Sequence, residues 1–454
     1  MISERNHFDV IVVGGGPAGS TCARDAALRG KSTCLIEMGN PINKRICPAK
    51  QLSIPCVGCK NCSIMSGFGG AGAFSDGKFT MPQKPGDYHI GGDLPFFIGY
   101  PDTNTLIRDR FMTHLAMGAP NNLIKEPNAS FIQEFDAKLA DAGLFRPHAD
   151  VNHIGTSAIQ RLYKKYQDEL IDLGVEVLFN TKVVDLCVEG KTVNGVVLAD
   201  GSKLFADNIV IASGRSGAAW FEKIVEKYDF PRKPALADFG FRIELPSAIM
   251  YDINTNLYEA KIMRRVNDMM IRMFCTNPNG AVVTEQTDGI IYVNGHSDDY
   301  PLSDKTNFAV LVTTPRFSQA DVRAIGEKFN DLGKPVVQRW VDLVDNIPSN
   351  RKHIDACNPT LITGTPANMR MLFPKREFRA IVEYMSALNS VIPGLTGPET
   401  LCYGLEAKFC HPGLDLTEEL RVAGWSGIIV IGDAGVTHGL SSAEASGLYA
   451  AHLI

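Results

Sequence analysis

Long hydrophobic runs, an excess of positive charge and low-complexity tracts are all absent from this sequence. No apolar run approaches the roughly 20 residues that span a bilayer, so we expect no transmembrane segment. Lys and Arg number 45 against 50 Asp and Glu, a formal net charge of -5. Because the basic residues also form no stripe, nucleic acid is not an expected partner. With 45% hydrophobic and 21% charged residues, the chain should fold as a globular protein.

A disulfide framework and secretion are equally unexpected. The 454 residues include 11 cysteines, an odd number, and four of these lie within sixteen residues, too close together for an ordinary disulfide framework. This usage fits a reducing compartment, so we expect a cytoplasmic protein. At roughly 100 to 200 residues per domain, the length predicts two to four domains.

The N-terminal segment has the pattern of a dinucleotide-binding motif. An apolar run at 8–13 leads directly into GGGPAG at 14–19. Gly14 permits a tight turn, Gly16 lets the backbone approach a pyrophosphate, and Gly19 lets the following helix pack close to the strand. The helix, expected over about 18–29, then directs its N-terminus toward the phosphates.

The segment after this helix supplies an acid at the expected place. A second strand, expected over 32–37, ends on Glu37, which follows Gly14 by 23 positions. Its carboxylate would accept hydrogen bonds from a ribose 2'-hydroxyl and repel a 2'-phosphate. Strand, glycines, helix, strand and acid in this order predict dinucleotide binding; the alternative is a doubly wound domain whose switch point holds no ligand.

Two later segments distinguish FAD from NAD. Residues 173–217 contain a strand, a hairpin and an apolar strand that ends before Gly214. Near the C-terminus, the buried strand 427–432 is followed by Asp433 and by a helix of small residues, expected over 441–453. This arrangement puts a carboxylate beside a ribitol or ribose and aims helix N–H groups at a ring carbonyl.

On these motifs the chain resembles the FAD-dependent oxidoreductases of the glutathione-reductase-like superfamily, on the branch with geranylgeranyl reductases and electron-transfer-flavoprotein dehydrogenases. A narrower likeness is to a bacterial group of uncharacterised FAD-dependent dehydrogenases. It rests on the segments 67–79 (GFGGAGAFSDGKF), 274–280, 293–297 and 405–408. This likeness implies a cofactor and a fold but no substrate, because one fold hosts many chemistries.

The resemblance implies an α/β fold with a Rossmann-like FAD-binding domain and a second, mainly antiparallel β-sheet domain for the substrate. It places the FAD-binding domain at 1–85, 150–235 and 395–454, with a Cys-rich loop at 47–62, and the substrate or cap domain at 86–149 and 236–394. The resemblance implies that the pyrophosphate lies on Gly14, Gly16 and Gly19, the adenosine ribose on Glu37, and the adenine edge on Val183 or Val184. It places the ribityl chain on Asp433 and the isoalloxazine against Gly439 and Leu440. The other residues implied to bind the cofactor are Pro17, Ala18, Gly70, Ala71, Gly72 and Gly214.

From Leu236 onward the pattern alternates between apolar and polar residues, with Gly and Asn at the turns, and this predicts an antiparallel sheet. The resemblance implies that this sheet covers the flavin and walls the substrate cavity. Expected strands are 239–245, 269–274, 281–285, 290–294 and 308–314, and expected helices are 319–330 and 377–389.

A second Gly-x-Gly-x-x-Gly motif is missing, so a separate NAD(P)H domain is not indicated. The electrons would come from a diffusible carrier such as ferredoxin or flavodoxin, from NAD(P)H bound transiently over the flavin, or from the substrate itself.

The cysteine cluster consists of Cys47, Cys56, Cys59 and Cys62, with the spacing C-x8-C-x2-C-x2-C. Three thiolates at intervals of three residues can converge on one metal ion from a loop. The pattern resembles the four-cysteine ligation of a [4Fe-4S] cluster, although the isolated Cys-Pro stands on the opposite side from the usual run. Structural Zn2+ and a loop of reduced thiols are the alternatives.

The catalytic candidates are polar groups expected near the flavin. His438 is the first choice for proton transfer, because it lies between the Gly-Asp turn and Gly439 and an imidazole titrates near neutral pH; a histidine bonded to backbone is the alternative. Cys275 would be a proton donor or a plain buried residue. Lys78 would be a catalytic residue or part of a solvated turn. Glu406 and Lys408 should form an ion pair on one strand face.

These observations predict an FAD-dependent oxidoreductase. It would move a hydride between flavin N5 and carbon of a small, partly apolar organic substrate, by alkene reduction or by desaturation. The rival functions are a flavin monooxygenase and an electron-transfer flavoprotein that relays electrons between protein partners.

Overall fold

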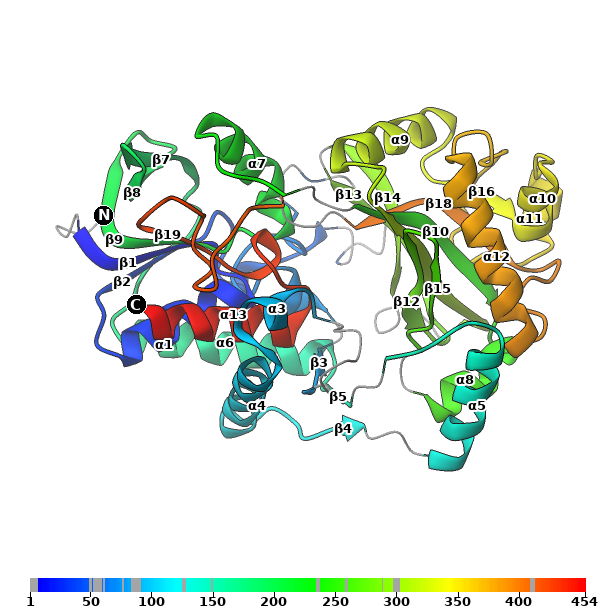
Figure 1. The fold of residues 1–454 in the computed structure, drawn as a ribbon, viewed down its shortest axis with the longest axis horizontal. Helices are drawn as coiled ribbons and strands as arrows, with labels where there is room; N and C mark the ends of the chain where they lie inside the picture. Colours follow the sequence, from blue (N-terminus) through cyan, green and yellow to red (C-terminus); the bar gives the residue numbers. More distant parts are fainter. Residues whose placement is uncertain are drawn as a thin grey trace. The chain divides into compact units, whose positions relative to one another are not determined.

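The computed structural model describes residues 7–48, 51, 59, 62–75, 77–82, 91–124, 128–147, 150–233, 237–257, 260–287, 289–296, 303–408 and 413–454. The chain forms two compact units, each with its own core (Figure 1). The first unit comprises Met1–Leu123, His148–Lys233 and Cys410–Ile454, and the second comprises Ile124–Pro147 and Pro234–Phe409.

The first unit is built on a mixed sheet of strand order β6-β2-β1-β9-β8-β7, with β19 paired to β9. β6, β2, β1, β9 and β19 are parallel, whereas β7, β8 and β9 form an antiparallel meander. β1, β2 and β19 are largely apolar and largely buried, as expected of parallel strands that are covered on both faces. The bounds are β1 His7–Val13, β2 Thr33–Ile36, β6 Glu176–Leu178, β7 Val183–Glu189, β8 Thr192–Leu198, β9 Lys203–Ile211 and β19 Ile428–Val430.

Helices cover this sheet. α1 packs against both α13 and α6, α4 packs against α13, and α7 packs against β7 (Figure 1). A Cβ atom on Gly447 of α13 would overlap the carbonyl oxygen of Ala18 in α1, so these two helices touch along their backbones. The bounds are α1 Pro17–Leu28, α3 Leu94–Ile98, α4 Tyr100–Ala116, α6 Thr156–Asp172, α7 Ala218–Lys227 and α13 Leu440–Leu453.

A small antiparallel sheet and several 3-10 turns complete the first unit. The small sheet has the order β3-β5-β4, and β3 also contacts α13. The bounds are β3 Lys78–Thr80, β4 Leu123–Ile124, β5 Val151–His153, η1 Ile42–Lys44, η2 Ala71–Phe74, η3 Arg215–Gly217 and η5 Gly432–Ala434.

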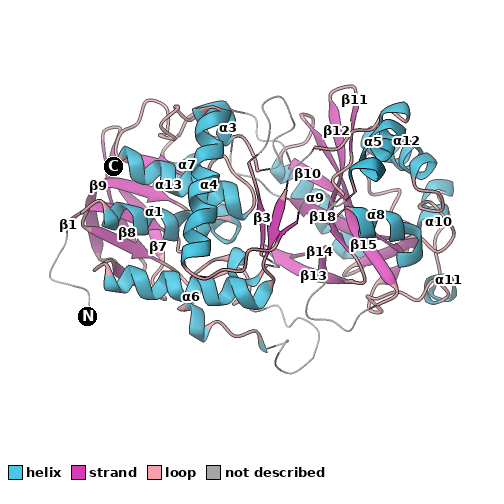
Figure 2. Ribbon diagram, turned by 90° about the horizontal axis from the view of Figure 1, so that it is seen from below, coloured by secondary structure: helices cyan, strands magenta, loops and turns pink. Residues whose placement is uncertain are grey.

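The second unit contains the expected antiparallel sheet, with strand order β11-β12-β15-β10-β18-β16-β17 (Figure 2). Among its described pairings, only β16 with β17 is parallel. β13 and β14 form a separate hairpin. The strands are β10 Ala237–Pro246, β11 Met263–Val266, β12 Met269–Asn277, β13 Ala281–Thr287, β14 Ile290–His296, β15 Lys305–Thr314, β16 Val336–Arg339, β17 Thr365–Pro366 and β18 Leu401–Lys408.

The two faces of this sheet differ in chemistry. Along β10, Phe239, Phe241 and Ile243 enter an apolar core, while Arg242 and Glu244 lie on the opposite face and are also buried. The apolar core is covered by helices, α12 among them. The helices and the remaining 3-10 turn are α5 Ala129–Asp141, η4 Ser247–Met250, α8 Tyr251–Asn256, α9 Gln319–Leu332, α10 Trp340–Asp345, α11 Arg351–Asp355 and α12 Lys375–Val391.

Two segments lie in a different unit from the one that the sequence suggests. The sequence assigns 86–123 to the substrate domain and 395–408 to the FAD-binding domain, whereas the structure places each in the other unit. The reason is packing between distant segments: α4 packs against α13, and β18 pairs with β10 and β16. None of the described helices is long and apolar enough to cross a membrane.

Candidate functional site

The glycines of the first turn form a cradle at the carboxyl end of β1. Gly14 has a φ of +109°, and a Cβ there or at Gly19 would overlap main-chain oxygen atoms. At Gly16, by contrast, the nearest heavy atom to a Cβ would be 3.9 Å away. Gly14 and Gly19 are therefore needed for close packing, while a Cβ on Gly16 would make only an ordinary van der Waals contact, with Gly70 Cα, next to the N-terminus of α1.

Glu37 lies at the carboxyl end of β2 and is buried. Its carboxylate accepts hydrogen bonds from the backbone N–H groups of Gly15 (2.7 Å), Gly39 (2.8 Å) and Gly67 (3.0 Å). A carboxylate can accept about four bonds. Glu37 thus fastens the glycine cradle to segment 67–74, and it keeps acceptor capacity for a ribose hydroxyl.

Segment 67–74 lies directly on the cradle. The N–H of Gly69 donates to the carbonyl of Gly15 (2.7 Å), and a Cβ on Gly70 would lie 3.1 Å from Gly16 Cα. Gly70 has a φ of +54°, and Ala71 begins the 3-10 turn η2. The structure therefore brings together two of the segments that were predicted to bind FAD.

Arg45 holds this segment in place, and the sequence contains no signal that singles it out. Its guanidinium is buried and donates to the carbonyl oxygens of Ser63, Ile64, Phe68 and Gly70 at 2.6 to 3.0 Å. Burial lowers the pKa of Arg45 to about 10, so the group stays charged at neutral pH.

The N-terminus of α13 meets the same place. A Cβ on Gly72 would lie 2.6 Å from Leu440 Cδ2 and 2.7 Å from Pro17 Cγ. Leu440 is the first residue of α13, and Gly439 before it has a φ of +78° and open space at its Cβ position. Three segments that are distant in sequence, 14–19, 67–74 and 439–440, therefore converge within the first unit.

Gly214 and Asp433 follow adjacent parallel strands, because β19 pairs with β9. Gly214 has a φ of +56° with open space at its Cβ position. The Asp433 carboxylate lies 3.7 Å from Arg215 Nε, and both side chains are partly exposed. Arg215 is a further polar group at this edge that sequence reasoning missed, although it directly follows the predicted Gly214.

The predicted adenine-binding residues lie at the start of β7. The N–H of Thr181 donates to the carbonyl of Glu37 (3.1 Å), so this segment passes beside the acid. Val183 is buried, whereas the Val184 side chain is exposed and its carbonyl accepts a bond from Trp220 Nε1 (3.1 Å).

His438 and Lys78, two of the three catalytic candidates, belong to the first unit. His438 is half-buried, and its backbone N–H donates to the carbonyl of Gly91 (2.9 Å). An antiparallel bridge between Gly92 and Thr437 holds this segment. Lys78 begins β3, opposite His153 of β5.

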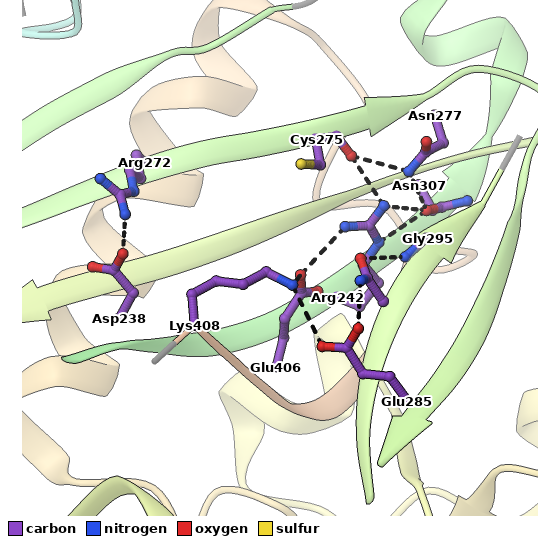
Figure 3. A network of polar contacts seen from close by, with 11 residues as sticks. Asp238, Arg242, Arg272, Cys275, Asn277, Glu285, Gly295, Asn307, Glu406 and Lys408 are labelled. Atoms are coloured by element: carbon purple, nitrogen blue, oxygen red, sulfur yellow. Dashed lines mark hydrogen bonds and ion pairs between the residues drawn. The ribbon is translucent and has the colours of Figure 1, made fainter. Parts of the chain in front are cut away.

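Cys275, the third candidate, belongs to the second unit and has a φ of +49°, which is unusual for a residue with a side chain. It lies where the pairing of β12 with β15 is irregular. Its carbonyl accepts bonds from Arg242 Nη2 (3.0 Å) and Asn277 Nδ2 (3.1 Å), as Figure 3 shows. These two donors hold the backbone of Cys275 in its strained conformation.

Arg242 is the centre of a buried network on the polar face of the second sheet (Figure 3). Its Nε and Nη2 donate to Asn307 Oδ1 at 2.9 and 2.7 Å, and its Nη1 lies 3.5 Å from Glu406 Oε1. Glu406 also pairs with Lys408 at 3.3 Å, which confirms the predicted ion pair. A Cβ on Gly295 of β14 would overlap Arg242 Nη2, so the hairpin covers the guanidinium closely.

The predicted metal site is not supported. Cys47, Cys59 and Cys62 carry free thiols, and Cys56 lies outside the described residues. Among the residues that the structure describes, no three His, Cys, Asp or Glu side chains are grouped so that they could hold a metal ion. The metal therefore stays a prediction.

Comparison with known proteins identifies the N-terminal segment. Residues 9–47 match the family model for the FAD binding domain, and this segment contains the glycine cradle and Glu37. No curated protein matches the sequence significantly.

Solved structures resemble the chain only weakly. A geranylgeranyl bacteriochlorophyll reductase-like protein from Thermoplasma acidophilum is 13% identical, with a TM-score of 0.40 over 99% of this chain and 78% of that chain. A glycine oxidase from Geobacillus kaustophilus is 11% identical, with a TM-score of 0.41 over 99% and 94%. A glycerol-3-phosphate dehydrogenase from Bacillus halodurans, complexed with FAD, is 14% identical, with a TM-score of 0.38 over 100% and 65%.

The family match covers the same residues that form the glycine cradle and its acid. FAD is the cofactor, and the protein is an FAD-dependent oxidoreductase.

Proposed function

We propose that this oxidoreductase, of the glutathione-reductase-like type, transfers a hydride between FAD and carbon of a small, partly apolar organic substrate, by alkene reduction or by desaturation. The observation that carries the proposal is the convergence of 14–19, 67–74 and 439–440 next to the carboxyl end of β1, one of the parallel strands of the mixed sheet. Ligands of open α/β sheets bind at this end of the strands.

We assign a part of FAD to each of these segments. The cradle at Gly16 and the N-terminus of α1 would hold the diphosphate, and Glu37 the adenosine ribose. The start of β7, at Val183 and Val184, would lie along the adenine, and Asp433, next to Arg215, would bind the ribityl chain. Gly72, Gly439 and Leu440 would lie against the isoalloxazine. FAD supplies the hydride-transfer chemistry when it is bound.

His438 is the group that we assign to proton transfer. It precedes Gly439 and Leu440 directly, and its main chain is fixed by Gly91. Its side chain is half-buried, and histidine is a common general acid and base. Lys78 and Cys275 stay second candidates; the clamped backbone of Cys275 supports a fixed direction for its thiol.

The four cysteines and the electron donor extend this proposal. A [4Fe-4S] cluster, or Zn2+, on Cys47, Cys56, Cys59 and Cys62 would lie just before segment 67–74 in the chain. Reduced ferredoxin, reduced flavodoxin and NAD(P)H are the donors to compare. Iron, sulfide and zinc analysis of anaerobically purified protein tests the metal, and a preparation without any of the three would remove it.

The experiment for the hydride step uses His438→Ala with His452→Ala as its control. His452 is also on the first unit, in the last turn of α13, far along the helix from Leu440. Dithionite-reduced protein is mixed anaerobically with 2-cyclohexenone, crotonate or geraniol, and reoxidation is followed at 450 nm. We expect His438→Ala to reoxidise about 100-fold more slowly, the usual effect of losing a general acid.

In the same experiment, His452→Ala should behave as the wild type. An unchanged rate in His438→Ala would clear His438 of this role. A wild-type protein that contains no FAD and takes none up would refute the function as a whole.

A further inference from the structure

A buried ionic cluster lies inside the first unit, centred on Glu444 of α13. The carboxylate of Glu444 is 0% exposed. Its Oε2 lies 2.7 Å from His114 Nε2 and 3.5 Å from Arg110 Nε, both on α4, and its Oε1 accepts a bond from the hydroxyl of Tyr163 on α6 (2.8 Å). The cluster therefore ties three helices together.

The members of this cluster also touch the segments that line the FAD site. The ring of Tyr163 packs edge-on against Phe68, and a Cβ on Gly69 would lie 3.0 Å from Tyr163 Cγ. Tyr163 thus links segment 67–74, which its ring contacts, to α13, to which its hydroxyl group donates.

His114 makes a second such link. Its ring lies 4.4 Å, between centroids, from the ring of Phe79 in β3, next to the candidate Lys78. Glu444 itself is one turn along α13 from Leu440, so the two side chains lie on the same face of the helix. Leu440 is the residue that contacts Gly72.

A third link reaches α1. Arg110 Nη1 lies 3.4 Å from the carboxylate of Asp25, and Asp25 also pairs with Arg24. α1 begins at the glycine cradle. The cluster is thus connected to every segment of the first unit that converges on the proposed isoalloxazine and diphosphate positions.

We propose that Glu444 is a positioning residue for FAD, which acts through Tyr163 and His114 to keep the N-terminus of α13 and segment 67–74 in register around the cofactor. This role rests on the proposed FAD site. None of these side chains needs to touch FAD, because Glu444 acts on groups that do.

A carboxylate suits this role better than a neutral group. Tyr163 donates to one of its oxygens and Arg110 to the other, which also lies 2.7 Å from His114 Nε2, and a charged acceptor makes stronger hydrogen bonds than a neutral one. An amide has only one acceptor oxygen, so Glu444→Gln cannot satisfy both sides of the cluster at once. The amide N–H groups would also face donors.

The test compares Glu444→Gln and Tyr163→Phe with Asp168→Asn. Asp168 is an exposed residue on the same helix as Tyr163, paired with Lys164. Each protein is stripped of FAD and titrated with FAD, with flavin fluorescence as the readout. The visible circular dichroism and the reduction potential of the reconstituted flavin are then measured.

We expect Glu444→Gln to raise the Kd for FAD at least tenfold and to change the visible circular dichroism of the bound flavin. Tyr163→Phe should raise the Kd about threefold. The double variant should bind FAD no more weakly than Glu444→Gln alone, because both residues act along one path. Asp168→Asn should match the wild type in every readout.

Four outcomes are informative. A wild-type protein that binds FAD, with Glu444→Gln and Tyr163→Phe equal to it in Kd, dichroism and potential, overturns the positioning role while the cofactor site stands. Additive effects in the double variant also overturn it. If Glu444→Gln does not fold, Tyr163→Phe alone decides, since it removes only one hydroxyl. A wild-type protein that binds no FAD refutes the site and this role together.

Discussion

Glu444 in the first unit and Glu244 in the second are both buried glutamates with almost no exposed surface, 0% and 1%, yet their pKa values move in opposite directions. Burial raises the pKa of Glu244 above its ordinary value, and the bonds from Thr360 and Tyr403 do not reverse this. Burial would raise the pKa of Glu444 as well, but His114, Arg110 and Tyr163 outweigh it and lower that pKa.

The difference lies in the partners. Glu244 accepts bonds from the neutral hydroxyls of Thr360 and Tyr403, the latter at 2.8 Å, and the cation that acts on it, Lys305, lowers its pKa less than these bonds do. Glu444 has a guanidinium and an imidazole within 3.5 Å. Equal burial therefore says little about the pKa of a carboxylate, because the partners of the carboxylate decide whether the effect of desolvation is outweighed.

The largest expected effect comes from removing the first carboxylate altogether. Glu444→Leu would leave buried Arg110 with Asp25 as its remaining carboxylate partner and would take the carboxylate away from buried His114, and we expect the free energy of unfolding to fall by about 3–5 kcal/mol. Urea denaturation at pH 7 measures this. Glu244→Leu is the matched change in the second unit, and an equal loss there would show that the partners make no difference.

A second change tests whether the network around Arg242 is as tightly packed as that around Glu444. In Gly295→Ala the new Cβ would overlap Arg242 Nη2, and the guanidinium cannot move without losing its bonds to Asn307 and Cys275. We expect a loss of about 1–3 kcal/mol, the usual cost of overpacking, in the same denaturation experiment. Gly289→Ala in the same hairpin, where a Cβ has space but φ is +82°, controls for backbone strain alone.

The pH dependence of stability should separate the two carboxylates by sign. The lowered pKa of Glu444 means that its contribution is present above pH 4.5, the ordinary value, and is lost as the pH falls through the lowered one. The raised pKa of Glu244 means that its contribution is present below pH 4.5 and is lost as the pH rises through the raised one.

Denaturation of Glu444→Gln and Glu244→Gln between pH 3.5 and pH 8 checks these signs. The free energy of unfolding of Glu444→Gln should be lower than that of the wild type, and this difference should shrink as the pH falls below 4.5. The free energy of unfolding of Glu244→Gln should rise relative to that of the wild type as the pH rises above 4.5, because the buried amide does not ionise. Parallel curves for the two variants would contradict the comparison.

The smallest expected effect is a gain. Cys275→Gly should stabilise the second unit by about 0.5 kcal/mol or more, because a strain of about 1–3 kcal/mol at its positive φ exceeds the entropic cost of glycine, about 0.5–1 kcal/mol. Cys275→Ala keeps the strain and serves as the control. Thermal unfolding followed by circular dichroism resolves the difference, and a loss in Cys275→Gly would mean that the thiol contributes to packing.

Local patterns predicted much of the fold. The run from β1 to Glu37 follows the spacing of one structural unit, and the alternation along β10, β12 and β15 predicted an antiparallel sheet; both are present. The predicted domain boundaries put α4 and β18 in the wrong unit. Each packs against a segment far away in the chain, α4 against α13 and β18 against β10.

The site shows the same division. Gly14, Gly16, Gly19 and Glu37 were predictable because their roles depend on backbone geometry within one strand-turn-helix segment. Arg45 and Tyr163 were not, since nothing near them in sequence shows which carbonyls or carboxylate they meet. Glu444 left one signal, a lone acid in a helix of small and apolar residues, which indicates a buried partner without naming it.

The sequence by itself determined the dinucleotide motif and the strand-rich second half, because these depend on periodicity and on residues a few positions apart, and the resemblance of its motifs to those of flavoproteins indicated FAD. Only the tertiary structure decided which buried charges are paired and which segments converge on the glycine cradle. The physical reason is that a charge inside a protein is stabilised by whichever groups the fold brings within a few ångströms, and those groups come from helices separated by up to 334 positions in the chain.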